Sequence, residues 1–355
     1  MEKALIAMSG GVDSSVAALL TKNKGFECIG CTMKLFSNDL ISLTLEESKC
    51  CSLNDIEDAR SVANKLEIPY YVFNFSDDFK SKVVDKFVFS YENGMTPNPC
   101  IDCNKYLKFA KLFERSKELG CDYVVTGHYA RVEFDGNKYI LKKALDETKD
   151  QSYVLYSLTQ EQLSHVLFPL GSLSKTETRK IALDNGFVNA RKKDSQDICF
   201  VPDGDYVSFL KRYTKKEYAP GNYIDLEGNV LGNHKGIIKY TIGQHKGLGI
   251  STEEPLYVGE VDIKNNTVTL VKNADLYKKD LLVKNFNWIS GEEPSGQISC
   301  LAKVRYRQKE QEAVATPLGK GMVKIEFKDP QRAITPGQSA VLYDGDVVIG
   351  GGEIY

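Results

Sequence analysis

The stretch from Lys3 to Asn23, KALIAMSGGVDSSVAALLTKN, constrains the fold of this chain more than any other. Residues 4–8 form a short, continuous apolar run, which is typical of a strand buried on both faces of a parallel sheet. A glycine-rich turn follows at once, and residues 16–20 then favour a helix whose start a serine or aspartate can cap. The sequence therefore predicts a strand, a tight turn and a helix start, and this arrangement forms an anion site.

The physical basis of such a site is the first turn of the helix, which leaves backbone N–H donors unpaired and carries partial positive charge. The turn matches neither the G-x-x-x-x-G-K-[ST] pattern, so it offers no P-loop lysine, nor the dinucleotide G-x-G-x-x-G pattern. It reads SGGVDSS, which resembles the PP-loop of the ATP pyrophosphatase family. That resemblance implies cleavage of ATP between its α and β phosphates, with adenylation of a substrate oxygen. The alternative is a turn of small residues with no ligand.

A chain of 355 residues is long enough for two or three domains. Its 26% charged and 42% hydrophobic residues are ordinary for a soluble globular protein, and no apolar run approaches the length of a membrane span. No basic and apolar signal precedes the glycine-rich turn, so we expect a cytoplasmic protein without a membrane partner. The net charge of −2 does not by itself indicate nucleic acid, so any RNA contact must come from local patches.

The nine cysteines are an odd number, and they predict structural thiols with a few reactive ones rather than a disulfide framework. Cys28 and Cys31 lie on the predicted strand Phe26–Leu35, where their odd separation sends them to opposite faces and favours packing over a metal pair. Cys50 and Cys51 precede a predicted helix and fit a buried helix entry better than a ligand site. The four histidines lack H-x-x-x-H spacing, so a zinc site built on histidine is not expected.

The segment Asn93–Asn104, NGMTPNPCIDCN, combines two prolines with two cysteines. Because proline disfavours regular structure, we expect an extended chain just before a helix at Lys105–Leu119. Cys100 and Cys103 then lie at or next to a helix N-terminus, where the dipole favours the thiolate form. Three interpretations stay open: a reactive thiol, a ligand of a cluster or metal, and inert packing.

Two more places are candidates for the site. Gly127 lies near the end of the predicted strand Cys121–Tyr129, and ligands of open α/β sheets collect at the carboxyl ends of strands, so Gly127 is expected to line the nucleotide site. His128 fits either the site or a structural role. Cys199, flanked by apolar residues after a polar loop, is the natural second thiol.

The sequence pattern changes beyond Pro202, where short predicted strands separated by glycines replace the alternation of strand and helix. We expect an α/β fold with a parallel-sheet PP-loop domain at residues 1–205, a small central β-rich domain at 206–278 and a C-terminal antiparallel β-barrel-like domain at 279–355.

A charged stretch lies within the last domain, where a strand is expected at Ile298–Tyr306. Continued through the following residue, the period of two puts Lys303, Arg305 and Arg307 on one face. These cations suit contact with a phosphate backbone, and an ordinary solvated strand face is nearly as good an interpretation.

Several motifs occur together in one order: SGGVDSS, Met33, CCS, TPNPCIDCN, TGHYAR, KDQSYVLY, DSQDICF, YTIGQHKGLGI and RYRQ. Together they resemble the tRNA-specific 2-thiouridylase family of the PP-loop ATP pyrophosphatase, or adenine nucleotide alpha hydrolase, superfamily. The resemblance covers essentially the whole chain. It implies an adenine nucleotide alpha hydrolase domain, a small central domain and a C-terminal β-barrel-like domain, and ATP-dependent sulfuration of C2 of the wobble uridine in tRNA.

The resemblance also implies roles for residues that match the family motifs. The backbone of the PP-loop and two outlying residues hold ATP with Mg²⁺: Ala7, Met8, Ser9, Gly10, Gly11, Val12, Asp13, Ser14, Met33 and Gly127. A second segment meets the target base: Asn98, Pro99 and Cys100. Two further segments contact tRNA: Lys149, Asp150, Gln151, Arg305 and Tyr306.

In the implied mechanism Cys199 carries a persulfide delivered by a sulfur-donor protein, either a cysteine desulfurase or a relay protein. Cys103 is the catalytic nucleophile that leaves a disulfide with Cys199. Some family members have aspartate at the position of Cys100, so an alternative is a [4Fe-4S] cluster held by Cys100, Cys103 and Cys199. Two alternatives of other classes are an ATP-dependent amide ligase on the same loop and a noncatalytic RNA-binding module.

Overall fold

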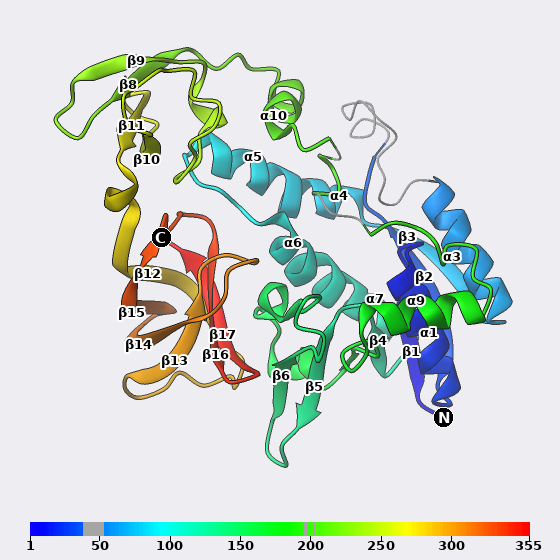
Figure 1. Cartoon of the computed structure of the whole chain (residues 1–355). Coiled ribbons are helices and arrows are strands. Elements are labelled where there is room, and N and C mark those ends of the chain that lie inside the picture. The colour runs from blue at the N-terminus through cyan, green and yellow to red at the C-terminus, as the bar shows by residue number, and fades with distance from the viewer. Residues whose placement is uncertain (38–52, 195–197, 202) are drawn as a thin grey trace.

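The computed structural model describes residues 1–37, 53–194, 198–201 and 203–355. Along the chain it shows a parallel sheet flanked by helices, then a small β-rich part, then an antiparallel barrel (Figure 1). The predicted fold class is therefore confirmed. The cysteines of the CCS motif lie outside the described residues. Within the described ranges, no helix has the length and apolar character needed to cross a membrane.

The N-terminal sheet has the order β3-β2-β1-β4-β7, and all of its neighbouring strands are parallel. Leu5 of β1 packs into the core on one face of the sheet, whereas Ala4 and Ile6 pack into the core on the other face. The apolar run is thus buried on both sides, as predicted. The strands are β1 (Lys3–Ala7), β2 (Glu27–Lys34), β3 (Tyr70–Asn74), β4 (Tyr123–Val125) and β7 (Val166–Leu167).

Helices cover both faces of this sheet. One core gathers side chains of α1, α3 and α9, and the other gathers side chains of the α4 to α7 region and α10. Cys28 and Cys31 belong to these two different cores, so the prediction that they face opposite ways is confirmed. The helices are α1 (Val12–Asn23), α3 (Leu53–Lys65), α4 (Ser76–Phe79), η1 (Lys80–Val84), α5 (Asp85–Glu92), α6 (Pro99–Asp102), η2 (Cys103–Lys111), α7 (Leu112–Glu118), η3 (Ser152–Leu155), α8 (Gln160–Leu163), α9 (Lys175–Asp184) and α10 (Tyr206–Thr214).

The helix expected at Lys105–Leu119 begins six residues earlier, at Pro99. Proline is well tolerated in the first helical position, because its missing N–H is one that the helix leaves unpaired anyway. Asn98 caps this start, since its side-chain oxygen accepts the N–H of Cys100 at 3.1 Å. Cys100 therefore lies in the first turn and Cys103 at the start of η2, one turn further along.

A hairpin leaves the parallel sheet and joins the barrel. It consists of β5 (Ala130–Phe134), which the sequence pattern did not indicate, and β6 (Tyr139–Lys143). Lys142 of β6 pairs with Val347 of the barrel strand β17 (Val347–Ile354). Figure 1 shows the hairpin between the two sheets, so the first and last parts of the chain share a continuous strand arrangement.

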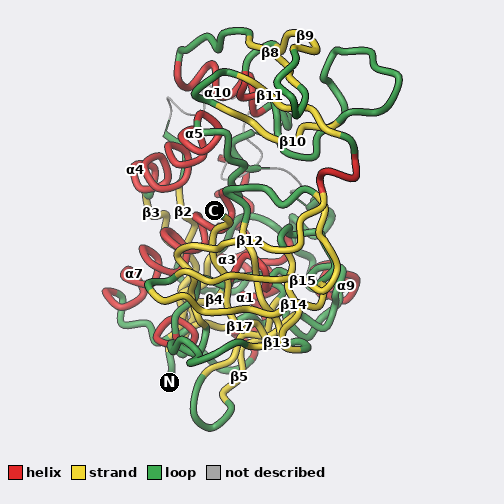
Figure 2. Tube along the Cα trace, turned by 90° about the vertical axis from the view of Figure 1, so that its left-hand side faces the viewer, coloured by secondary structure: helices red, strands yellow, loops and turns green. Residues whose placement is uncertain are grey.

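The central β-rich part has the strand order β10-β11-β8-β9. Figure 2 shows this part at one end of the molecule, next to the barrel. Rings of Tyr223, His234 and Tyr240 pack edge to face in its core. Its elements are β8 (Gly221–Ile224), β9 (Val230–His234), η4 (Ile237–Lys239), β10 (Tyr257–Asp262), β11 (Thr267–Val271) and η5 (Asn273–Leu276).

The barrel has the order β12-β15-β14-β13-β16-β17, and pairing of β12 with β17 closes it. The strand expected at Ile298–Tyr306 ends at Lys303, and a turn follows. Lys303 is buried and pairs with Glu310 at 3.2 Å, so the predicted face of three exposed cations is wrong. The remaining strands are β12 (Tyr277–Trp288), β13 (Ile298–Lys303), β14 (Gln311–Gly319), β15 (Met322–Arg332) and β16 (Ser339–Asp344).

The barrel also fixes the extended segment ahead of α6. The N–H of Thr96 donates to the carbonyl of Pro336 at 2.9 Å, and the side-chain amide of Gln338 donates to the carbonyl of Thr96 at 2.7 Å. Gly337 lies so close that an added Cβ would be 2.9 Å from the Cβ of Met95. The extended segment that contains the two prolines is therefore held in place by the barrel.

The packing of the barrel generates a stability prediction. Ile325 is fully buried, and its truncation in Ile325→Ala is expected to cost about 2–5 kcal/mol of barrel stability. Trp288 is the only tryptophan and is buried in the same core, so its fluorescence during urea unfolding reports on the barrel. Leu318→Ala, at a side chain that is 55% exposed, is the matched control and should shift the midpoint little. Equal shifts for both variants would contradict the barrel core described here.

Candidate functional site

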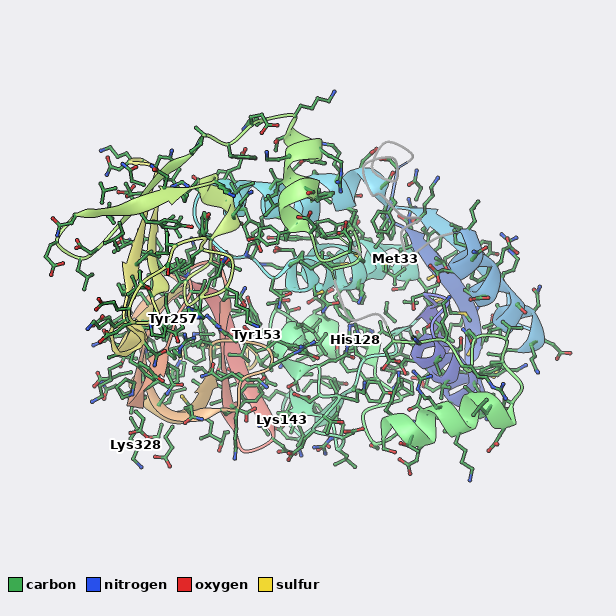
Figure 3. The ribbon with its side chains drawn as sticks, turned by 45° about the horizontal axis from the view of Figure 1, so that its top comes forward. Met33, His128, Lys143, Tyr153, Tyr257 and Lys328 are labelled. Atoms are coloured by element: carbon green, nitrogen blue, oxygen red, sulfur yellow. The ribbon has the colours of Figure 1, made fainter. Side chains whose placement is uncertain are left out.

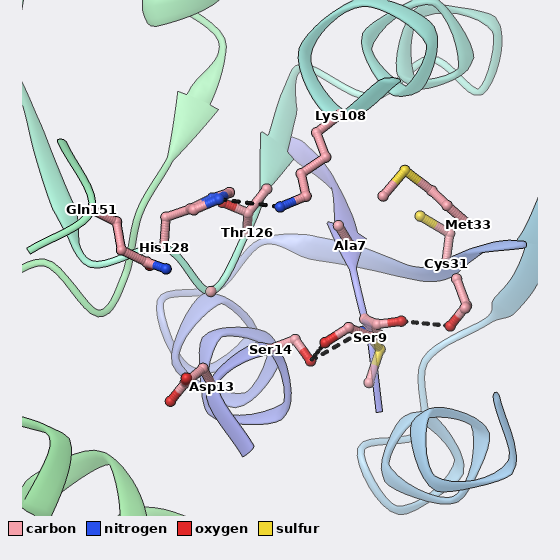
Figure 4. A pocket seen from close by; sticks show the side chains of 13 residues that line it. Ala7, Ser9, Asp13, Ser14, Cys31, Met33, Lys108, Thr126, His128 and Gln151 are labelled. Atoms are coloured by element: carbon pink, nitrogen blue, oxygen red, sulfur yellow. Dashed lines mark hydrogen bonds between the residues drawn. The ribbon is translucent and has the colours of Figure 1, made fainter. Parts of the chain in front are cut away.

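A pocket of about 190 Å³ opens at the carboxyl ends of β1, β2 and β4 (Figure 4). Residues that the sequence analysis assigned to ATP form much of the pocket wall. Figure 3 shows two lining residues, Met33 and His128, near the middle of the molecule and far from Lys328 in the barrel. Of the predicted ATP residues, these line the pocket: Ala7, Met8, Ser9, Asp13, Ser14, Met33 and Gly127. Gly10, Gly11 and Val12 belong to the same turn but do not line the pocket.

The turn leaves the start of α1 without a side-chain cap. Gly11 is the N-cap residue, and within the described residues this helix start has no side-chain cap hydrogen bond. The predicted serine or aspartate cap is therefore wrong, because glycine occupies the N-cap position. Ser14 and Ser15 lie inside the helix, and their hydroxyls donate to the carbonyl of Gly11 at 3.1 and 3.0 Å. The N–H groups that a cap would have satisfied stay available to an anion at the positive end of the helix dipole.

The turn is held from behind by the segment that follows α9. The side-chain amide of Asn189 donates to the carbonyl of Gly10 and to the hydroxyl of Ser15, both at 2.9 Å. Gly10 has a φ of +73°, and an added Cβ would lie 2.3 Å from the carbonyl oxygen of Asp55. The glycine is required here by both backbone conformation and space.

Gly127 packs against the turn from the end of β4. An added Cβ would lie 2.8 Å from the carbonyl carbon of Asp13 and from the N of Ser14. The backbone approach therefore needs a residue without a side chain. This contact explains why a glycine 113 residues after Ser14 belongs to the same site.

Six lining residues were not among the predicted ATP residues: Cys31, Thr32, Lys108, Thr126, His128 and Gln151. Gln151 was predicted to contact tRNA; its backbone and side chain both pair with the backbone of Tyr129. Thr126 adjoins Gly127, so the TGHY motif could have indicated it. Lys108 carries no such signal, because it reaches the pocket from a helix whose sequence looks ordinary.

His128 is a buried pocket residue with both ring nitrogens paired. Nε2 lies 3.2 Å from Nζ of Lys108, and Nδ1 lies 2.6 Å from the hydroxyl of Thr126. Burial, and then the charge of Lys108, hold the pKa of His128 well below its usual range. Since an ammonium can only donate, neutral His128 accepts at Nε2 and donates from Nδ1 to Thr126.

The carboxylate of the PP-loop is also engaged. Lys175 donates to both oxygens of Asp13 at 2.7 and 2.8 Å, and the hydroxyl of Tyr129 donates to one of them at 2.9 Å. Lys175 pairs with Asp194 as well, at 2.8 Å, and Asp194 is further paired with Arg179. One lysine thus bridges the PP-loop and Asp194, the first residue of the DSQDICF segment.

Two of the three candidate thiols pack against one core, and the third, Cys100, is exposed. Cys103 and Cys199 are half-buried and pack against the hydrophobic core that contains Cys31 and Met33 of the pocket wall. Cys100 is exposed and close enough to Tyr306 for its charge to contribute to raising the pKa of that phenol, after burial and the charge of Asp150. The catalytic roles of Cys103 and Cys199 stay predictions.

Metal sites are tested by the side chains that gather in one place. Among the described residues, which include all three thiols, no group of three His, Cys, Asp or Glu side chains could hold a metal ion. These residues therefore do not fit the three-cysteine ligand set of the [4Fe-4S] alternative. The only carboxylate lining the described pocket, Asp13, has both oxygens engaged by Lys175, so the residues do not present a preformed Mg²⁺ site either.

The predicted tRNA residues meet at one seam between the first domain and the barrel. The hydroxyl of Tyr306 donates to the carbonyl of Asp150 at 3.1 Å. Lys149 pairs with Asp194 at 3.0 Å, and the Asp150 carboxylate accepts from Ser152 within its own turn. Arg305 points inward and donates to the carbonyl of Ala333 and to the hydroxyl of Thr335. Its guanidinium therefore stabilises the barrel and is not presented at the surface.

A steric prediction follows from the contact between Gly127 and the PP-loop. Gly127→Ala is expected to displace the turn at a cost of roughly 1–3 kcal/mol, which corresponds to about a 5- to 150-fold rise in the Kd for ATP. Isothermal titration calorimetry measures this. The control is Gly296→Ala, where an added Cβ meets nothing within 4 Å and binding should not change. Unaltered ATP affinity in Gly127→Ala would remove this residue from the site.

A pH prediction follows from Asp194. Burial would raise its pKa, but hydrogen bonds from Lys175 and Lys149 outweigh it and lower the pKa to about 2. The stabilisation is complete above the unfolded pKa of about 3.9 and is lost as pH falls toward 2. Asp194→Asn should therefore cost about 2 kcal/mol at neutral pH, with the difference shrinking between about pH 4 and pH 2. Urea unfolding followed by circular dichroism at 222 nm checks this; a difference independent of pH in that window would contradict it.

Comparison with known proteins matches the whole chain to one family. Residues 2–203 match the family described as "tRNA methyl transferase HUP domain", residues 207–272 its "PRC-barrel domain", and residues 278–354 the "Aminomethyltransferase beta-barrel domain". A solved 4-thiouridine synthetase in complex with RNA and ATP covers 59% of this chain and 50% of its own, at 19% identity and a TM-score of 0.35. That structural similarity is too low to carry an argument about the site.

Relatives of similar length are much closer. The chain is 50% identical over 355 residues to the tRNA-specific 2-thiouridylase MnmA of Clostridioides difficile (strain 630). The matched region covers 99% of this chain and 98% of that relative. The chain is 52% identical over 354 residues to tRNA-specific 2-thiouridylase MnmA 2 of Caldanaerobacter subterraneus subsp. tengcongensis, with 99% and 97% covered. Full-length identity of this order, together with the PP-loop pocket, shows that the chain belongs to the tRNA-specific 2-thiouridylase family.

Proposed function

We propose that this protein is an ATP-dependent tRNA-uridine 2-sulfurtransferase, which replaces the C2 oxygen of the wobble uridine in tRNA with sulfur and forms AMP and pyrophosphate. The observation that carries the proposal is full-length identity to named 2-thiouridylases, in a chain whose PP-loop pocket shares a core with two half-buried thiols. The amide ligase and the noncatalytic RNA-binding module account for neither thiol.

ATP serves in the first half of the reaction. The C2 oxygen of the uridine is a poor leaving group, whereas AMP is a good one, so activation must precede the arrival of sulfur. The C2 oxygen attacks the α phosphorus, the bond to the β phosphate breaks with its electron pair going to pyrophosphate, and the N3 proton is lost. The uncapped start of α1 and the backbone at Gly127 bind and orient the phosphates for this step.

Sulfur arrives in the second half as a persulfide on Cys199, supplied by a donor protein of the cysteine desulfurase or relay class. The terminal sulfur attacks C2 and AMP leaves. The Cys103 thiolate then attacks the inner sulfur of Cys199, so the sulfur–sulfur bond breaks and C2 keeps the terminal sulfur as a thiocarbonyl. Two thiols are oxidised to one disulfide, the transferred sulfur is reduced, N3 regains a proton, and a thiol reductant must restore the enzyme.

The base reaches these groups only if it leaves its stack, as enzymes that act on bases require. The segment Asn98–Cys100 forms the start of α6, one turn before the half-buried Cys103, and within it Cys100 is exposed, Asn98 is half-buried and Pro99 is buried. Tyr306 lies beside it, against the carbonyl of Asp150. We assign base contact to Asn98, Pro99 and Cys100, and contact with the tRNA stem or loop to the segments 149–151 and 305–306, where Arg305 acts by fixing the turn that presents Tyr306.

The thiol mechanism generates a direct prediction. Cys103→Ser and Cys199→Ser should each abolish 2-thiouridine formation, because serine can neither carry nor resolve a persulfide, while the Kd for ATP stays within about twofold of wild type. Nucleosides from tRNA incubated with ATP and a sulfur source are measured by mass spectrometry. Cys300→Ser is the matched control, since Cys300 belongs to the barrel core and should leave activity intact.

A Cys103→Ser or Cys199→Ser protein that still forms 2-thiouridine would remove the substituted thiol from the reaction. Loss of activity in Cys300→Ser as well would show that the losses report on folding rather than chemistry. Circular dichroism on all three variants separates these two cases.

A further inference from the structure

Among the described residues that line the pocket, Lys108 is a cation whose charge no described carboxylate balances. Lys108 and Asp13 are the charged residues that line the described pocket. Asp13 is taken by Lys175, with which it shares two short contacts. In the part of the chain that the structure describes, the ammonium of Lys108 has no carboxylate partner, and its partner is the neutral ring of His128 at 3.2 Å.

His128 holds this ammonium without neutralising it. Its Nε2 accepts one of the three N–H donors of Lys108, and its Nδ1 donates to Thr126. The ring is buried against Phe109 and Phe168, with ring centroids 5.8 Å apart in each case, so its position is set by packing. Two donors and the full positive charge of Lys108 therefore remain for a ligand.

The position of Lys108 complements the PP-loop. Figure 4 shows Lys108 entering from η2 on one side of the pocket, with the turn from Ser9 to Ser14 on the opposite side and Ala7 between them. An anion in the pocket would have the uncapped start of α1 on one side and an ammonium on the other. The SGGVDSS loop has no lysine of its own, so η2 supplies from outside what a P-loop carries within its motif.

We propose that Lys108 is a catalytic residue of the adenylation step. Its ammonium contacts the phosphate chain of bound ATP, at the α phosphate and at the departing pyrophosphate. This inference rests on the proposed function. As the bond between the α and β phosphates breaks, its electron pair moves to pyrophosphate, and negative charge grows where the Lys108 ammonium lies. A preorganised donor of this kind typically contributes a factor of about 10²–10³ to the rate. η2 would thus deliver both the Cys103 thiol and the cation of the first step.

The experiment compares Lys108→Met and Lys108→Arg with Lys111→Met, a matched change on the same helix at a lysine that pairs with Glu114 near the surface. Pyrophosphate release is followed in single turnovers with saturating ATP and tRNA. Lys108→Met should slow release about 10²–10³-fold, Lys108→Arg should restore part of the rate, and Lys111→Met should stay within about twofold.

Binding measurements identify what Lys108 touches. The Kd for ATP should rise in Lys108→Met while the Kd for adenosine, which has no phosphates, and the salt dependence of tRNA binding stay unchanged. Equal losses for ATP and adenosine would overturn the proposal and make Lys108 a structural residue. A salt slope for tRNA binding reduced by about one, with ATP binding intact, would assign Lys108 to the RNA backbone and also overturn it.

The wild-type reaction separates a failure of the proposed function from a failure of the role assigned to Lys108. If wild-type protein makes no 2-thiouridine under conditions that support pyrophosphate release, the proposed function fails while the Lys108 result stands. If wild type thiolates tRNA and Lys108→Met releases pyrophosphate at the wild-type rate, the role of Lys108 fails alone.

Discussion

The structure depends on a helix that begins without a cap. At the start of α1 a glycine, Gly11, occupies the N-cap position and has no side chain to accept the first N–H groups, so the positive end of the helix stays open to an anion. That arrangement needs support elsewhere, because an unsatisfied helix start is costly to keep. Asn189 holds the turn from behind, and Gly127 packs against it from β4.

The packing around β1 and the barrel also brings together segments that are distant in the sequence. β1 is buried on both faces, and the core on one of them extends to Cys103 and Cys199. The barrel reaches the site through Tyr306 and through its hold on Thr96, so it positions the segment that precedes Cys100 as well as the seam proposed for tRNA. In the proposed reaction, the nucleotide that activates the uridine and the thiols that deliver sulfur therefore bind around the same core.

Local signals were enough to predict the parallel-sheet part, the order of the domains' fold types and seven of the residues that line the pocket, because SGGVDSS and its flanking strand and helix are contiguous. Contacts that depend on tertiary structure could not be predicted from the sequence. Lys108 and Lys175 look like surface lysines on ordinary helices until the fold places them beside His128 and Asp13. Pro99 was treated as a breaker, although the first helical position accepts proline, and β13 ends at Lys303 because the chain must turn back to form β14. The predicted roles of the tRNA-contacting residues stay predictions.

The most direct measurement of the central claim follows the oxygen that the reaction removes. If the pocket on α1 activates the uridine by adenylation, tRNA labelled with ¹⁸O at C2 of the wobble uridine must pass that atom to the phosphate of AMP. Mass spectrometry of the AMP formed in a single turnover should then find one ¹⁸O for each 2-thiouridine made. Label in water or pyrophosphate, with unlabelled AMP, would contradict the account.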